Sequence, residues 1–270
     1  MVICAEEVEK ARHRFAGRIH RTPVITCESI DKVAGCKVFM KCEHLQKTGS
    51  FKARGALNAV QKMKDEGPVK GVVRYLLLHC LYREETCARL AKELNYQVVE
   101  PFNNPDVICG QGTIGAEIVE QVPDADAVFL AVGGGGMASG ITAYIAEVRP
   151  DIKVYLVEPE GKELTAYLTN GEITPERDVV DTVADGIRVL KVGEYCYPIL
   201  KKSCTDKVIT VSDDEIRAAL KLIWTRTKQR VEPSAAVPLA GLLKVSPSEL
   251  GVKKAVLLLC GGNVDLDFVP

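Results

Sequence analysis

The stretch AVFLAVGGGGM, residues 127–137, runs from an apolar strand-like segment straight into four glycines. Glycine leaves backbone N–H groups uncovered and permits positive φ. The small residues that follow, Ala138-Ser139-Gly140, indicate the start of a helix. A helix N-terminus with uncovered amides binds anions, usually phosphate. The residues predicted to form this phosphate site are Gly133, Gly134, Gly135, Gly136 and Met137.

The alternative is a flexible turn, but the position directly after a buried strand favours the phosphate site. The spacing is neither the GxGxxG of dinucleotide-binding folds nor the Gly-Lys-Ser/Thr of a P-loop. A second strand-like run, Ala255–Cys260, also ends in glycines, Gly261 and Gly262. Ligands of open α/β sheets bind beyond the carboxyl ends of strands, so we expect both loops at one edge of a sheet.

Strand-like and helix-like segments alternate through the chain, with Ser50 as the expected N-cap of the second helix. This alternation predicts an α/β fold with a mostly parallel twisted sheet and helices on both faces. The expected strands are Lys37–Lys41, Ala127–Val132, Lys153–Glu158, Lys207–Val211 and Ala255–Cys260. The expected helices are Ala5–Ala16, Ser50–Glu66, Arg83–Leu94, Ala138–Arg149 and Asp213–Lys228.

The composition is that of an ordinary globular protein of 270 residues with a formal net charge of -1. That charge balance favours neither nucleic acid nor an anionic membrane as a partner. The ten cysteines are scattered without a CxxC pair, and the four histidines form no HxxxH, so a zinc site is not expected. The acidic N-terminus does not resemble a signal peptide, and no apolar run reaches transmembrane length. We therefore expect a cytoplasmic protein with reduced thiols.

Lys52 lies in GSFKARGA, residues 49–56, near the start of an expected helix. A lysine there is most often solvated surface, and its charge opposes the helix dipole. A functional lysine would benefit from the same position, because positive potential lowers its pKa and frees the amine for chemistry. The local pattern alone still favours the solvated surface lysine.

Several motifs in a fixed order make the chain similar to the serine racemase and serine/threonine dehydratase family, which has the type II pyridoxal phosphate fold. They are HRTPV (20–24), KCEHLQKTGSFK (41–52), GSFKARGA (49–56), GQGTI (110–114), GGGGM (133–137), VADGI (183–187), VEPSAAV (231–237) and LCGGNVD (259–265). The resemblance covers nearly the whole chain. It implies a pyridoxal phosphate enzyme, a racemase or ammonia-lyase, that acts on a small amino acid, serine or threonine, as a homodimer.

The resemblance also assigns roles to matching positions. Lys52 would bind the cofactor as a Schiff base, and Phe51 would pack on its ring, while the four glycines and Met137 hold the phosphate. Gly186 and Glu232 would line the edge of the ring. Cys260 would face the pyridine nitrogen, and because a thiol is a weak hydrogen-bonding group it would not keep the ring strongly protonated. Such a ring suits elimination and racemisation better than transamination.

Two further sites are implied. Glu158 matches a carboxylate that ligates Mg²⁺ or Ca²⁺ in the family, although the second carboxylate falls near Leu164 unless a one-residue gap brings Glu163 into place. A strand-end glutamate in solvent is the alternative. An ATP effector would lie at a subunit interface, at positions that match Lys47, Thr48, Lys228 and Asn263.

The chain departs from the family after Val73. The family carries a Ser-Ser-Gly-Asn-His-Gly motif there, in which the asparagine holds the cofactor's phenolic oxygen and a serine is the second acid/base of racemisation. This chain reads RYLLLHCLY over residues 74–82 instead. We therefore expect a large cofactor-binding domain, 1–50 and 105–270, and a truncated remnant of the small domain, 51–104. A non-catalytic relative, which at most binds cofactor or pairs with a full-length subunit, is the alternative function.

Overall fold

The computed structural model describes residues 2–73, 83–172 and 179–270. The stretch Arg74–Tyr82, where the sequence departs from the family, lies outside the described residues. The helices are α1 Ala5–Arg14, α2 Glu28–Ala34, α3 Lys52–Glu66, α4 Arg83–Leu94, α5 Pro105–Gln121, α6 Gly136–Val148, α7 Leu164–Asn170, α8 Tyr197–Cys204, α9 Asp213–Thr227 and α10 Pro233–Lys244. The strands are β1 Val24–Thr26, β2 Lys37–Lys41, β3 Val72–Val73, β4 Gln97–Val98, β5 Ala127–Ala131, β6 Lys153–Pro159, β7 Val208–Val211 and β8 Lys254–Leu258. Short 3₁₀ turns cover Glu43–Leu45, Lys47–Gly49 and Asp185–Ile187.

A six-stranded sheet in the order β1-β2-β8-β5-β6-β7 forms the centre of the molecule. All neighbours are parallel except the edge pair β1 and β2. The central strand β5 is buried along its whole length, as expected for a parallel strand covered on both faces. The predicted α/β class with a mostly parallel sheet is confirmed, and the five expected strands all lie in this sheet.

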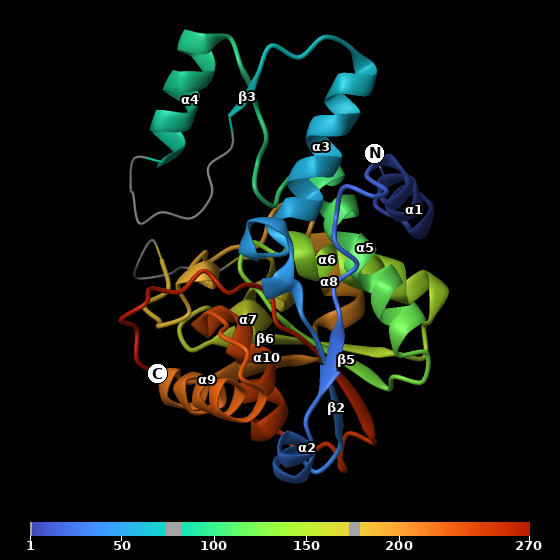
Figure 1. Ribbon diagram of the computed structural model, residues 1–270, viewed down its shortest axis with the longest axis vertical. Coiled ribbons are helices and arrows are strands. Elements are labelled where there is room, and N and C mark those ends of the chain that lie inside the picture. Colours follow the sequence, from blue (N-terminus) through green and yellow to red (C-terminus); the bar gives the residue numbers. More distant parts are fainter. Residues whose placement is uncertain (1, 74–82, 173–178) are drawn as a thin grey trace.

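Two groups of helices cover the sheet (Figure 1). Helices α2, α9 and α10 contact one another, and α10 packs along β5, β6, β7 and β8. Helices α1, α5, α6 and α8 form the other group, in which α8 contacts β6. Between these layers lies one large apolar core that includes Phe129, Leu156 and Leu257, all fully buried.

Helix α4 and strands β3 and β4 lie with the distal end of α3 apart from this sheet (Figure 1). Here β3 and β4 form a parallel pair of only two residues each. The buried cluster beneath them consists of Ala59, Val99 and Val107, with Val98 still 42% exposed. This is a small core for a sheet-and-helix unit, and a strand pair of this size contributes little stability by itself. The division at residues 50 and 105 stays a prediction.

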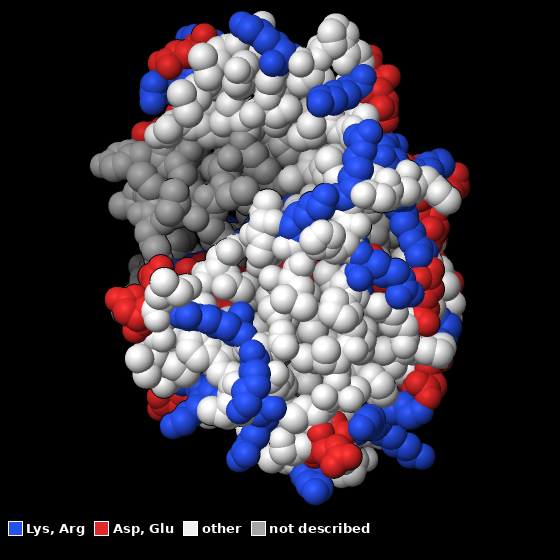
Figure 2. Space-filling model, viewed as in Figure 1, with Lys and Arg blue, Asp and Glu red and all other residues white. Residues whose placement is uncertain are grey.

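Charged side chains of both signs are interspersed on the face shown in Figure 2. This mixture agrees with the near-zero formal charge of the chain. In the described part of the chain, no helix is both long and apolar enough to cross a membrane.

Candidate functional site

The carboxyl ends of β5 and β8 open into one cleft, as the two glycine-ended strands predicted. Its empty space is about 800 Å³ including the open mouth, a size typical of small-molecule sites. The glycine loop, Phe51, Lys52, Gly186, Glu232 and Cys260 all line it. The structure therefore brings together every residue that the resemblance assigned to the cofactor.

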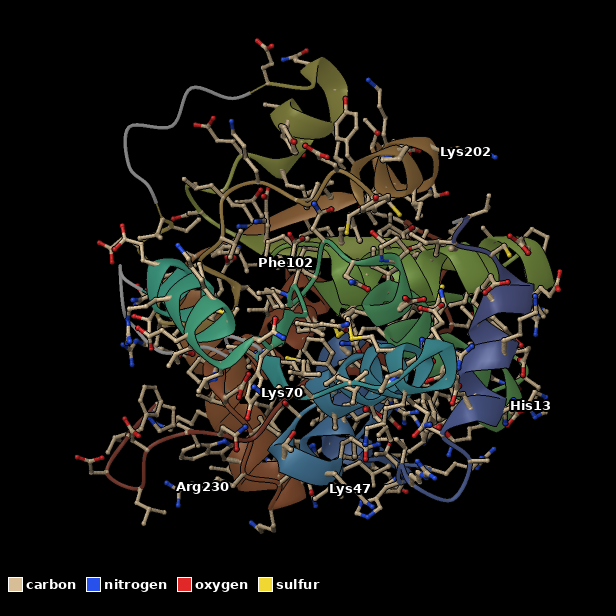
Figure 3. All side chains as sticks on the ribbon, turned by 90° about the horizontal axis from the view of Figure 1, so that it is seen from above. His13, Lys47, Lys70, Phe102, Lys202 and Arg230 are labelled. Atoms are coloured by element: carbon tan, nitrogen blue, oxygen red, sulfur yellow. The ribbon has the colours of Figure 1, made fainter. Side chains whose placement is uncertain are left out.

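The glycine loop packs tightly against its surroundings, which include Phe102 in the wall of the cleft. A side chain on Gly134 would collide with the ring of Phe102, which Figure 3 labels near the centre of the view. Gly135 has a φ of +89° and caps α6 in the left-handed conformation. A Cβ there would lie 3.0 Å from Cys196. Glycine is thus required by both space and backbone conformation.

The amides of this loop are available to an anion. Within the described ranges, no hydrogen bond uses the N–H of Gly134, Gly135, Gly136 or Met137 as its donor. These amides start α6, so the positive end of its dipole points toward the same place. Accessible N–H groups at a helix N-terminus fit a phosphate group.

Lys52 is the first residue of α3, and the end of β8 holds it in place. The N–H of Phe51 donates to the carbonyl of Cys260 at 3.1 Å, and Ser50 forms a bridge with Gly261. Ser50 is therefore extended rather than the predicted N-cap, a position that Phe51 takes without a capping side chain. The Lys52 Nζ lies 5.6 Å from the centre of the Phe51 ring.

A buried ion network beneath α3 fixes the direction of this helix. Arg54 is fully buried and donates twice to Glu43, with both N–O distances 2.8 Å. It also donates to Glu117 at 2.7 and 3.0 Å and to the Thr113 hydroxyl at 3.2 Å. Lys41 donates to the same Glu117 at 2.5 Å. All of these residues except Glu117 belong to the quoted motifs, but sequence reasoning gave them no role, because charged residues usually lie in solvent.

Removing the Arg54 charge should strongly destabilise the protein. In Arg54→Leu, the fully buried Glu43 would lose both of its bonds to the guanidinium and would remain buried without a cation. Breaking a buried ion pair in this way costs on the order of 3–5 kcal/mol. Urea unfolding measures the loss, with Arg89→Leu as control, because the exposed Arg89–Glu93 pair on α4 is worth at most about 1 kcal/mol. Equal effects of the two substitutions would contradict a structural role for Arg54.

Glu232 lines the cleft between Gly186 and Gly261. Its N–H donates to the Gly261 carbonyl at 3.0 Å, and its Oε2 accepts from the N–H of Asn263 at 3.2 Å. Burial raises the pKa of Glu232 to about 7, against the opposing charge of Lys52. A carboxyl that titrates near neutrality in a cleft is typical of a functional site.

Cys260 and Ser234 complete the wall of the cleft. Burial raises the pKa of the Cys260 thiol well above its usual range, so it stays protonated. The Ser234 hydroxyl, also buried, accepts from the N–H of Gly186 at 3.0 Å. Ser234 lies in the quoted VEPSAAV motif but was not predicted as a site residue. Its position beside Glu232 would have been the only available signal.

The remaining predicted residues lie away from the cleft. Glu158 is 2% exposed at the end of β6 and does not line it. The four nucleotide candidates are exposed, and only two of them meet, where the Asn263 side-chain amide donates to the Thr48 carbonyl at 3.0 Å. Lys47 lies at the periphery of the view in Figure 3.

A family model described as pyridoxal-phosphate dependent enzyme matches residues 16–75 and 82–261. The fold and the cleft thus define a cofactor-dependent enzyme of the type II class, and the chain belongs to the pyridoxal-phosphate dependent enzyme family. It is 36% identical to a serine racemase of Dictyostelium discoideum, with 99% of this chain and 97% of the relative covered. It is 35% identical to a beta-hydroxyaspartate dehydratase of Paracoccus denitrificans, with 98% of each chain covered. A crystal structure of a pyridoxal 5'-phosphate-dependent aspartate racemase superposes with a TM-score of 0.91 at 33% identity, over 99% of this chain and 98% of the other.

The comparisons also locate a shortened region. The alignment with the Dictyostelium relative spans 317 residues, whereas this chain has 270, so the relative carries internal residues that this chain lacks. The family match stops at residue 75 and resumes at 82. This is the place where the sequence departs from the family's motif order.

Proposed function

We propose that this protein is a pyridoxal phosphate-dependent ammonia-lyase that acts on a small β-hydroxy amino acid, serine or threonine, with racemisation as a minor activity. The main support for this proposal is that Lys52 lines one cleft together with the glycine loop, Glu232 and Cys260. The glycine-loop amides would bind the phosphate of pyridoxal phosphate, and the Lys52 amine would react with its aldehyde.

Each part of the cleft has a separate task. The amides of Gly134 to Met137 hold the phosphate, and the positive end of the α6 dipole adds to the attraction. When bound, pyridoxal phosphate supplies an electron sink for the charge left at the substrate's Cα. The Lys52 Nζ takes the Cα proton as general base. The protonated Cys260 thiol, a weak hydrogen-bonding group, leaves the ring nitrogen without a strong acid partner.

The test of this function is keto acid formation from amino acids with and without a β-hydroxyl group. We expect the cofactor-loaded protein to release keto acid and ammonia from L-serine or L-threonine. L-Alanine is the matched control, because it offers the same Cα proton but no leaving group. A coupled dehydrogenase assay follows the keto acid, and comparable release from L-alanine would contradict elimination.

A non-catalytic role is the second candidate, favoured by the internal residues that relatives have and this chain lacks. The unit built from α4, β3 and β4 would normally provide a wall of the cleft, and its strand pair is only two residues long. Cofactor uptake without any product from serine or threonine would support this reading. Failure to take up cofactor would remove the lyase and leave the non-catalytic role.

We also propose a cytoplasmic homodimer that binds ATP at its interface. None of the nine cysteines in the described part of the chain forms a disulfide, which supports a reducing compartment. Lys47, Thr48, Lys228 and Asn263 are exposed, as an effector site shared between subunits requires.

A further inference from the structure

Lys162 is a fully buried lysine in the turn between β6 and α7. Its Nζ donates to three main-chain carbonyls, at 3.0 Å to Gly133, at 3.2 Å to Leu190 and at short range to Val189. A neutral amine has only two N–H donors, whereas an ammonium has three. Three carbonyl acceptors around one nitrogen therefore select the charged form.

This ammonium ties the glycine loop to its neighbours. Gly133 is the first residue of that loop, and Val189 lines the same cleft. Burial lowers the pKa of Lys162 to about 8, against the opposing charge of Glu158. The three carbonyl acceptors nevertheless favour the ammonium, one hydrogen bond away from the first residue of the predicted phosphate site.

The surroundings of Glu158 do not fit a divalent cation. Its Oε2 accepts from the N–H of Leu164 at 2.8 Å, and its Oε1 accepts from the Thr210 hydroxyl at 3.1 Å. Buried Leu164 stands where a second carboxylate was expected, and Glu163 is exposed. Among the described residues, no three His, Cys, Asp or Glu side chains gather as a metal site would require. Mg²⁺ and Ca²⁺ need six or more oxygen ligands in an ordered shell.

We propose that the Lys162 ammonium is a built-in cation that holds the glycine loop in its phosphate-binding form, in place of a divalent metal. Main-chain carbonyls are ligands that a hard cation also uses, and here the lysine satisfies three of them. Lys162 acts on the cofactor only through the loop, so it is a positioning residue. The affinity measurements below rest on the proposed function, because they require the protein to bind pyridoxal phosphate. The measurement with metals follows thermal unfolding and does not require cofactor binding.

The first experiment titrates the unmodified protein with Mg²⁺, Ca²⁺ and EDTA. We expect its melting temperature to stay unchanged by all three, and its pyridoxal phosphate affinity, followed by absorbance, to change less than about twofold. A saturable rise in melting temperature with either metal, lost in Glu158→Gln, would overturn the proposal. This measurement stands even if every Lys162 variant fails to fold.

The second experiment compares Lys162→Met with Ile30→Ala, a change at a fully buried position of α2 that does not line the cleft. Both should lower the melting temperature, the first because it leaves buried acceptors without a donor and the second because it opens a cavity. Only Lys162→Met should also weaken pyridoxal phosphate binding, by about ten- to a hundredfold, as expected for loss of a hydrogen bond from a charged group. Equal cofactor affinities in the two variants would overturn the role in the loop.

The third experiment restores the cation from solution. Lys162→Ala removes three carbons and the nitrogen of the side chain, the heavy atoms of propylammonium, and should leave a channel of that length. We expect millimolar propylammonium to raise the pyridoxal phosphate affinity of Lys162→Ala at least tenfold. It should not raise the affinity of Lys162→Met, where the channel stays filled. Tetramethylammonium at equal ionic strength, which cannot donate hydrogen bonds, is the matched salt. Recovery by both salts alike would overturn the proposal.

Discussion

Replacing Lys52 with alanine should abolish covalent attachment of pyridoxal phosphate and reduce turnover to background. The Lys52 amine is fixed at the first residue of α3, because Phe51 and Ser50 are bound to the end of β8. Loss of a positioned general base alone costs about a hundred- to ten-thousandfold in rate. The loop amides remain in the variant, so we expect weaker, reversible cofactor binding to persist.

Borohydride reduction followed by peptide mass analysis measures the attachment. In the unmodified protein the label should fall on Lys52. Lys47→Ala is the matched control, because Lys47 is exposed five residues earlier and its loss should leave the label in place. Lys52→Arg keeps a positive charge but not a nucleophilic amine, and should behave as Lys52→Ala does. A label on another lysine in the unmodified protein would refute the assignment.

The central sheet was predictable because its strands are apolar runs between helices. Lys37–Lys41 coincides with β2, and the runs that end in Gly133 and Gly261 became β5 and β8. Both are buried parallel strands, for which continuous hydrophobicity is the normal pattern. The convergence of the two glycine-ended strands followed from the same reasoning, since carboxyl ends of parallel strands share one edge.

Helix α5 could not be predicted from periodicity, although it contains the quoted GQGTI. It is buried through most of its length, so it lacks a polar face that would show a helical period. Its glycines, which disfavour helix, are required by neighbours. A Cβ at Gly110 would lie 2.7 Å from the Gly55 Cα, and one at Gly112 would lie 2.9 Å from the Gly140 carbonyl oxygen. Close helix packing therefore overrides local propensity there.

The buried charges were missed for a different reason. A lone lysine such as Lys162, in a turn with Glu160 and Glu163, has the sequence pattern of solvated surface. Its burial depends on the carbonyls of Gly133, Val189 and Leu190, which come from distant parts of the chain. No local pattern encodes such a meeting. The residues that line the cleft, in contrast, could be predicted because ordered motifs resemble those of one family.

The choice between elimination and racemisation should follow from the shortened region. In the proposed reaction, Lys52 would serve one face of the substrate's Cα, where it would take a proton and return it. Inversion requires a second group on the opposite face. In the resembling family that group is a serine of the Ser-Ser-Gly-Asn-His-Gly motif, and this chain has no such motif where the family match breaks between residues 75 and 82. With L-serine we therefore expect keto acid as the main product and D-serine near background, a shift of about a hundred- to ten-thousandfold against racemisation.

Incubation with L-serine in D₂O separates the two faces of the reaction. Deuterium should enter the Cα of recovered L-serine with retention, because Lys52 exchanges its proton with solvent and returns it to the same face. Chiral chromatography should find almost no D-serine, while the keto acid accumulates. The Dictyostelium serine racemase, treated in parallel, is the comparison for inversion. D-Serine formed faster than keto acid would mean that another residue serves the second face, and Tyr75, His79, Cys80 and Tyr82 of the divergent segment would be the first to replace. Retention without inversion, in contrast, would place all proton transfer on the Lys52 face, since an intact opposite-face acid would mix the two configurations.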